Sequence, residues 1–279
     1  MIRQVKQIIT PNAVTDGAGV SIKRSIATRT LDYLDPFLLF DHFGSDNPDE
    51  YMAGFPMHPH RGIETVTYMQ RGLVRHEDSI GNAGVIGPGD VQWMTAGRGV
   101  MHEEMPQPGE SGLSGFQLWV NLPAVQKLSP PRYQEVLSDE IPVVQLDNGG
   151  TVRVITGSYA GSSGPVAEIA VAPVYLDIHL PAGGTFTIDT PAGHTVFAYA
   201  YAGRGAFAGT AVDASQPRLV VFEDGSSLQA EAGEQPFSFL LVMGKPIGEP
   251  IARYGPFVMN TREEIMQALH DLENGTFVS

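Results

Sequence analysis

Short apolar segments alternate with turns rich in glycine and proline along most of the chain, and this pattern limits the folds that the chain can adopt. The 279 residues include 32 glycines and 21 prolines, about one residue in five. Turn signals at this density favour many short strands over long helices. The spacing predicts an all-β sandwich or barrel, with strands at 63–68, 73–78, 91–94, 115–122, 151–155, 174–180, 195–201, 218–222 and 237–243.

A polar connection divides the chain into two strand-rich halves. Residues 123–142 hold four prolines and a polar stretch, and strand-like sequence resumes at Val143. We therefore expect two domains, over residues 1–135 and 143–279. The two halves have weak sequence similarity: residues 65–72 resemble residues 195–203 at an offset of about 130 positions, which is weak support for a duplicated domain.

One helix is expected, at the C-terminal end. Thr261 and Glu264 have the spacing of a capping box, in which the side chain of each residue bonds to the backbone of the other. Ile265, Leu269 and Leu272 then form a stripe at helical spacing. The expected helix is therefore short and amphipathic.

Composition and charge exclude several classes of protein. The chain has no cysteine, which excludes disulfide frameworks, thiolate-bound zinc, iron–sulfur clusters and a cysteine nucleophile. Its net charge of −14 opposes direct binding to nucleic acid or to an anionic membrane. The N-terminus lacks a signal-like apolar stretch, and no apolar run approaches the ~20 residues of a membrane span. We expect a soluble cytoplasmic protein.

Two pairs of polar residues mark a candidate metal site. His58 and His60 form one pair, and His102 and Glu104 form the other. Residues i and i+2 of a strand point to the same face, so two such pairs on neighbouring strands bring four ligands together. Three imidazoles and a carboxylate suit a first-row transition metal. A single His-x-His pair is weak support, because such a pair also arises by chance, and Pro59 requires a strand end or edge.

Several long segments resemble the pirin family of the cupin superfamily. Residues 58–68 (HPHRGIETVTY) and 89–106 (GDVQWMTAGRGVMHEEMP) carry the resemblance, and residues 34–41 and 254–261 also match. The resemblance implies two tandem cupin β-barrels of jelly-roll type, with a short C-terminal helix. It also implies one iron ion in the N-terminal barrel, bound by the same four residues that the strand geometry selects.

The metal and its surroundings leave alternatives open. Fe(II) is the ion that the resemblance implies, but affinity orders for such ligands make Mn, Co, Ni, Cu or Zn possible as well. Glu64, which the broader cupin motif often uses as a ligand, is expected beside the metal ligands, where it would orient an imidazole. The alternative is that Glu64 pairs with Arg61 or Arg71 across the sheet.

The C-terminal half departs from this pattern, so we expect one metal ion and not two. At the offset of 130, His58 and His60 fall on Ile188 and Thr190, and Glu64 falls on His194. His179 stands alone in an apolar strand, where a histidine is more often a core residue with its hydrogen bonds satisfied than a ligand. The second barrel, over about residues 143–258, is therefore expected to have an apolar interior.

The resemblance implies two kinds of function. Some pirins are flavonol dioxygenases of the quercetinase type, which open the central ring and release carbon monoxide; others are regulators that bind a transcription factor or a metabolic enzyme. We favour the enzyme, with a flavonol and O2 as substrates and Glu104 as the general base, because it is the only carboxylate among the expected ligands. Trp93, Met94 and Phe116 either line the substrate cavity or fill the barrel. A monomer is expected, because two cupins in one chain already form a pair.

Overall fold

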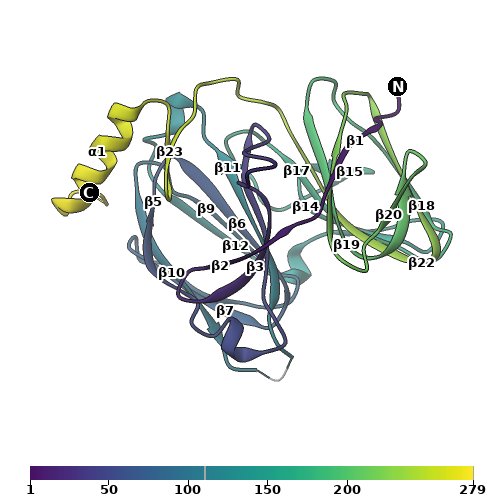
Figure 1. The fold of residues 1–279 in the computed structure, drawn as a ribbon, viewed down its shortest axis with the longest axis horizontal. Coiled ribbons are helices and arrows are strands. Elements are labelled where there is room, and N and C mark those ends of the chain that lie inside the picture. The colour runs from purple at the N-terminus through teal and green to yellow at the C-terminus, as the bar shows by residue number, and fades with distance from the viewer. Residues whose placement is uncertain (110, 279) are drawn as a thin grey trace. The chain divides into compact units, whose positions relative to one another are not determined.

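The computed structural model describes residues 1–109 and 111–278, which form β-strands, three short 3-10 helices and one α-helix (Figure 1). They divide into two compact units. The N-terminal unit comprises residues 12–138 and 247–279, and the C-terminal unit comprises residues 1–11 and 139–246. The expected all-β class is confirmed, with the expected short helix at the C-terminal end.

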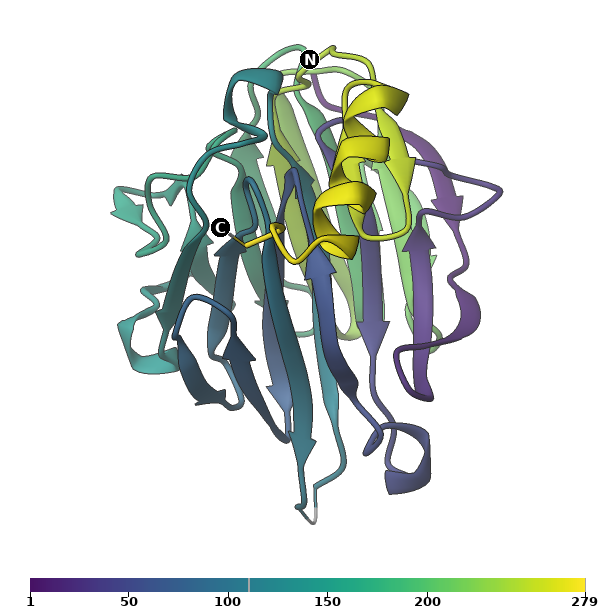
Figure 2. The same ribbon diagram turned by 90° about the vertical axis from the view of Figure 1, so that its left-hand side faces the viewer.

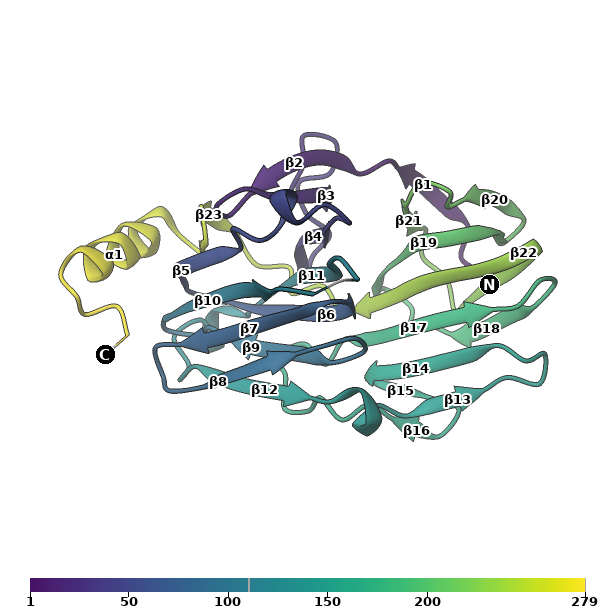
Figure 3. The ribbon, with the colours of Figure 1, turned by 90° about the horizontal axis from the view of Figure 1, so that it is seen from below.

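The N-terminal unit is built from two antiparallel sheets and a small hairpin. Its strands are β2 (Asn12–Asp16), β3 (Val20–Ile26), β4 (Phe37–Phe43), β5 (Phe55–His60), β6 (Ile63–Arg71), β7 (Leu73–Asp78), β8 (Ala83–Ile86), β9 (Val91–Thr95), β10 (Val100–Gln107), β11 (Ser114–Asn121), β12 (Arg132–Val136), β23 (Ala252–Tyr254) and β24 (Phe257–Met259), with 3-10 turns at Pro48–Glu50, Ala124–Gln126 and Ser138–Glu140. The larger sheet has the order β12-β9-β6-β11-β4-β3-β2, and the smaller has the order β5-β10-β7-β8 (Figure 3).

Alternation along β10 explains how this unit places polar side chains inside. Val100, His102, Glu104 and Pro106 are buried, whereas the residues between them are partly exposed. This period of two is the pattern of a strand with one face toward the interior. The inner face of the smaller sheet therefore presents an imidazole and a carboxylate side by side with apolar residues.

The C-terminal unit consists of one large sheet around an apolar core and a separate two-stranded sheet, β15-β16. Its strands are β1 (Val5–Ile9), β13 (Val143–Gln145), β14 (Thr151–Thr156), β15 (Ser158–Tyr159), β16 (Ser162–Ser163), β17 (Val174–Leu180), β18 (Thr185–Asp189), β19 (Thr195–Phe207), β20 (Thr210–Asp213), β21 (Arg218–Phe222) and β22 (Ser227–Gly244). The order is β1-β21-β19-β22-β17-β14-β13, with β18 on β22 and β20 on β19. Phe186, Phe207, Phe237 and Phe239 are buried at the centre of the core.

Each unit incorporates a segment from the far end of the chain. The strand β1 pairs antiparallel with β21, so residues 1–11 belong to the C-terminal unit. Residues 247–279 return to the N-terminal unit. This division differs from the predicted ranges of 1–135 and 143–279 at both termini. The reason is that local sequence predicts a strand but not its pairing partner. Here β1 pairs with β21, and Phe257 of the returning segment forms a bridge with Arg61.

The C-terminal helix α1 (Arg262–Glu273) begins with the expected capping box, in which the Thr261 side chain accepts a hydrogen bond from the Glu264 backbone N–H and the Glu264 side chain accepts one in return. The helix is drawn in yellow in Figure 2. Ile265 and Ala268 are its buried positions, and they pack with Phe257 and Phe277. No helix within residues 1–109 and 111–278 is long and apolar enough to span a membrane.

Candidate metal centre

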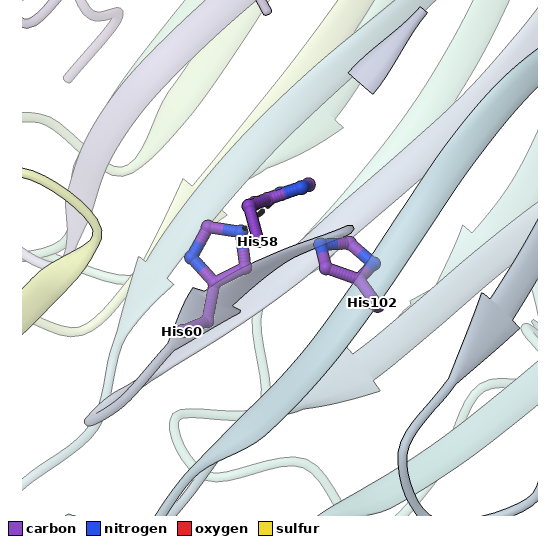
Figure 4. A group of neighbouring side chains, drawn as sticks. All are labelled: His58, His60 and His102. Carbon is purple, nitrogen blue, oxygen red and sulfur yellow. Dashed lines mark hydrogen bonds between the residues drawn. The ribbon is translucent and has the colours of Figure 1, made fainter. Parts of the chain in front are cut away.

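Three imidazoles meet on the inner face of the smaller sheet (Figure 4). His58 and His60 lie on β5, and His102 lies directly opposite His58 on β10. One ring nitrogen from each residue lies within 4.8 Å of the other two. The i, i+2 spacing of the first pair and the antiparallel register of the two strands therefore bring these three residues together.

The position of β5 explains how His58 is oriented. Its sheet begins at β5, so the strand has a free edge that tolerates Pro56 and Pro59, which donate no hydrogen bond to a neighbour. The His58 Nδ1 lies 2.9 Å from the Pro56 carbonyl oxygen, which can only accept, so Nδ1 carries the proton. In neutral His58 the Nε2 atom then has a free electron pair, and it faces the His60 Nε2 at 3.1 Å.

His60 and His102 are suited to bind a metal in their neutral form. Burial lowers the pKa of both residues well below the usual range, and the neighbouring imidazoles lower it further. Both ring nitrogens of His102 are buried and have no hydrogen-bond partner among the described residues. Buried polar atoms are rarely left without a partner. Three converging imidazoles, one with both nitrogens unsatisfied, fit a bound transition-metal ion.

Glu104, the expected fourth ligand, is buried on the same face of β10 but is not part of the three-histidine cluster. Its Oε1 atom accepts a hydrogen bond of 2.8 Å from the Thr67 hydroxyl. The Gln117 amide nitrogen lies 3.3 Å from both carboxylate oxygens and donates to Thr67 Oγ1 at 3.0 Å. The pairing of β10 with β5 is irregular between His102 and Glu104. Sequence analysis did not identify Thr67 or Gln117, since neither belongs to a ligand-type pair.

Glu64 is almost completely buried, and its Oε1 atom accepts a hydrogen bond of 2.9 Å from the Thr95 hydroxyl. The two arginines that sequence analysis offered as its partners form ion pairs elsewhere. Arg61 pairs with Asp271 of α1 at 2.7 Å, and Arg71 pairs with Asp46. An orienting role for Glu64 and its pairing with either arginine both stay predictions.

A fourth histidine lies beside the cluster, and sequence analysis gave it no role. The rings of His76 and His102 are 5.4 Å apart. The Gln92 amide nitrogen donates to His76 Nδ1 at 2.8 Å, so Nε2 carries the proton and faces Asp78 at 3.4 Å. His76 has hydrogen-bond partners on both ring nitrogens, which explains why it lies beside the cluster without belonging to it.

An open cavity of about 530 Å³ reaches His58 and His60. This volume is typical of sites for small molecules. Trp93, Met94 and Phe116 are almost completely buried and fill the barrel, so Trp119 is the tryptophan that lines the cavity. The other lining residues include Asp16, Arg24, Leu39, Asp41, Phe55, Gln117 and Arg253.

The C-terminal unit has isoleucine and threonine at the positions that correspond to His58 and His60 at the offset of 130. Ile188 lies opposite Leu228, and both belong to the apolar core. Thr190 accepts a hydrogen bond from the Arg3 side chain. No second cluster of potential metal ligands occurs in the part of the chain that the structure describes.

His179 is not the core residue that sequence analysis expected. Leu176, Ile178 and Leu180 face the core, so His179 lies on the opposite face of β17, and 44% of its side chain is exposed. Its Nδ1 atom lies 3.0 Å from the Ser238 hydroxyl, and Asp177 raises its pKa. The expectation that its hydrogen bonds are satisfied is confirmed.

Comparisons with known proteins agree with this architecture. Residues 19–120 match the pirin family model, and residues 175–278 match the model of the pirin C-terminal cupin domain. The chain is 46% identical to the "Putative quercetin 2,3-dioxygenase" of Pseudomonas aeruginosa, over 98% of this chain and 97% of that protein. It is 45% identical to a pirin-like protein of Caulobacter vibrioides, over 99% of both.

A solved structure gives the same result. The crystal structure named quercetin 2,3-dioxygenase from Acinetobacter baumannii superposes with a TM-score of 0.89 at 34% identity, covering 100% of this chain and 99% of that one. The two cupin domains and the family that the sequence resembles are therefore confirmed. The chain belongs to the pirin family of cupin proteins.

Proposed function

We propose that the chain binds one transition-metal ion through His58, His60 and His102, and that it cleaves the central ring of a flavonol such as quercetin with O2, releasing carbon monoxide. The observation that carries the proposal is the convergence of three imidazoles, two of which, His58 and His60, line a cavity of about 530 Å³. The quercetin 2,3-dioxygenase names of two relatives support the substrate class.

Glu104 is the proposed fourth ligand and general base. Fe(II) is the first candidate for the ion, and Mn, Co, Ni, Cu and Zn are compatible with the same donor atoms. The bound ion would supply Lewis acidity, which favours the deprotonated form of a flavonol hydroxyl.

The surrounding side chains would hold the carboxylate and the substrate in place. Thr67 and Gln117 donate hydrogen bonds to Glu104, which fixes the direction in which its oxygens can accept a proton. A carboxylate within hydrogen-bond reach of the substrate hydroxyl would take up its proton as the ring becomes electron-rich. Trp119, Phe55 and Leu39 line the cavity with apolar surface, which fits an aromatic substrate.

The decisive experiment measures oxygen uptake and carbon monoxide release with quercetin after loading with each candidate metal. Glu104→Gln keeps the size of the side chain but removes the base, so turnover per bound metal should fall ~10²–10⁴-fold. The matched control is Glu103→Gln, because Glu103 is the next residue of the same strand, points to its other face and pairs with Arg75.

Two results would contradict parts of this proposal. If Glu104→Gln turns over as fast per bound metal as the parent, then Glu104 is not the base. If no metal-loaded form consumes oxygen with any flavonol, then the chain is the regulator that the resemblance also allows, and partner binding that differs between the ferrous and ferric forms becomes the expected property.

A further inference from the structure

Arg253 is a solvent-exposed cation in the wall of the cavity, and its own contacts with the protein are few. It lies on β23, in the segment that returns to the N-terminal unit. Its guanidinium lies 5.0 Å from the centre of the Trp119 ring and donates one hydrogen bond, of 3.3 Å, to the Leu38 carbonyl oxygen. Among the described residues, no carboxylate lies within ion-pair distance of it.

The other arginine of the cavity shows the contrast. Arg24 binds Asp41 through two nitrogens, at 2.9 and 2.7 Å, and also binds Asp16 at 2.7 Å. These carboxylates raise the pKa of Arg24 despite its burial. Burial lowers the pKa of Arg253 and the charge of Arg24 lowers it further, whereas the charges of Asp32 and Asp41 raise it. Arg24 therefore already has carboxylate partners, whereas the guanidinium nitrogens of Arg253 bind no carboxylate among the described residues and can bind an added anion.

The position of Arg253 connects it to the histidine cluster. The Trp119 ring contacts the guanidinium of Arg253. The centre of the Trp119 ring also lies 5.0 Å from the centre of the His60 ring, and the two rings are almost perpendicular. The charge of Arg253 contributes to the lowered pKa of His60. A group bound to Arg253 thus shares the cavity with the imidazoles.

Arg253 also lines a second hollow, together with another cation, Arg29. Arg24, Arg29, Asp32 and Arg253 line this hollow, which has a volume of about 640 Å³. Asp32 is the one carboxylate among these lining residues, and Arg24 is already paired with Asp41 and Asp16. The remaining guanidinium groups, Arg29 and Arg253, are positive sites in a chain whose net charge is −14. Such a chain repels anions unless a local cation attracts them.

We propose that Arg253 binds an anionic group of the substrate, so that the site selects aromatic compounds that carry a sulfonate, sulfate or carboxylate over neutral ones. The identity of the aromatic part, a flavonol, rests on the proposed function. The planar fork of a guanidinium recognises such oxyanions with two parallel hydrogen bonds. Stacking on Trp119 holds this fork in place before the substrate arrives.

The test compares quercetin with quercetin 5′-sulfonate. The dissociation constant of each is measured with the metal-loaded protein under anaerobic conditions, where no turnover occurs. Quenching of tryptophan fluorescence gives the readout, because Trp93 and Trp119 are the two tryptophans of the chain. A charge-assisted contact at a partly exposed site should make the sulfonate bind about tenfold more tightly.

Variants then assign this preference to one side chain. Arg253→Met should abolish the preference without weakening quercetin itself more than about threefold, because it removes the charge and keeps apolar contact with Trp119. Arg253→Lys should retain part of the preference. The matched control is Arg262→Met, which removes the same charge from an exposed position at the start of α1 and should leave the preference unchanged.

The outcomes separate this inference from the proposed reaction. A sulfonate that binds no more tightly than quercetin, or a preference that survives in Arg253→Met, overturns the role of Arg253 whether or not quercetin is cleaved. A preference that depends on Arg253 in a protein that cleaves no flavonol supports the anion site and overturns only the reaction.

Discussion

The two units place different chemistry on equivalent pairs of strands. In the N-terminal unit, His58 of β5 lies opposite His102 of β10. In the C-terminal unit, Ile188 of β18 lies opposite Leu228 of β22. Both pairs face the interior, because antiparallel register brings residues on the same face together. The difference teaches that the sheet determines where a pair of side chains meets, and residue type decides whether the pair is a site or a core.

The units also differ in how they hold the terminal segment that each receives. Arg3 is almost completely buried in the C-terminal unit, where it donates to the Thr190 hydroxyl and to two backbone carbonyls. Lys127 is buried in the N-terminal unit, where its ammonium group donates to Gly62, Asn121 and Val258. Val258 lies in the returning segment. We call Arg3 and Lys127 the two anchors of the terminal segments. The Arg3 guanidinium keeps its proton at any ordinary pH, whereas the Lys127 amine can lose its proton.

The largest effect on metal binding is expected when His58 and His102 are replaced by the residue types of the C-terminal pair, isoleucine and leucine. The double variant His58→Ile with His102→Leu should lose its metal completely, from about one equivalent to none, and turnover should fall at least ~10³-fold. Two of the three imidazoles are gone, and one remaining imidazole binds a metal weakly. Elemental analysis after incubation with Fe(II) or Ni(II) gives the readout.

The same double variant should remain folded. Replacing buried polar groups by apolar side chains of similar size is often neutral for stability. A metal-free melting temperature within a few degrees of that of the metal-free parent would show this. A variant that retains one equivalent of metal would contradict the assignment of the site.

A smaller effect is expected in the apolar core of the C-terminal unit. Phe207 is completely buried and contacts Phe222, Phe237 and Phe239, with ring centres 5.3, 5.5 and 5.0 Å away. Phe207→Ala should lower the free energy of unfolding by about 3–5 kcal/mol, because it leaves a cavity in a close-packed interior. Urea unfolding measures this, and metal content per folded chain should not change. A cost below ~1 kcal/mol would show that the core is loosely packed.

The histidine cluster could be predicted from the sequence because the spacing that brings its residues together is local. The His58–His60 pair needs only the period of a strand to share a face, and the pirin-like segments place both pairs in one barrel. The partners of Glu104 are different, because Thr67 and Gln117 lie on other strands and belong to no ligand pattern. Contacts of this kind depend on strand pairing, which local sequence does not encode.

The extent of the strands shows the same limit. The sequence predicts a strand at 237–243, whereas the strand β22 in the structure extends from Ser227 to Gly244. In its first half Leu228, Ala230 and Ala232 alternate with polar residues, but alanine gives only a weak apolar signal. The exchange of terminal segments could not be predicted from the sequence either, because the strand β1 pairs with β21, which is far away along the chain.

The two anchors should respond differently to alkaline pH. Burial lowers the pKa of Lys127 to about 8, against the opposing charges of Glu249 and Glu264. The folded protein therefore releases this proton near pH 8, whereas the unfolded chain keeps it up to its ordinary value of 10.5. Since the unfolded state binds more protons in this window, stability rises with pH, by about 3 kcal/mol at most. Arg3 keeps its proton throughout.

Urea unfolding at pH 7.5 and pH 10.5 tests this difference in the parent, Lys127→Met and Arg3→Met. The stability of the parent relative to Lys127→Met should increase with pH. The stability of the parent relative to Arg3→Met should stay constant. A Lys127 difference that stays constant or decreases would mean that the ammonium group is not destabilised by burial.

The smallest expected effect is at His194, the position that corresponds to Glu64 at an offset of 130. His194 follows a turn, and its backbone N–H donates to the Pro191 carbonyl oxygen, a bond that alanine also forms. Its side chain lies outside the apolar core and outside the three-histidine cluster. His194→Ala should change the free energy of unfolding by less than ~0.5 kcal/mol, as is usual at the surface, and leave metal content unchanged. His58→Ala, measured in parallel, should lose both metal and turnover. A second equivalent of metal that disappears in His194→Ala would mean that both units bind an ion, and the contrast between a site and a core would then fail.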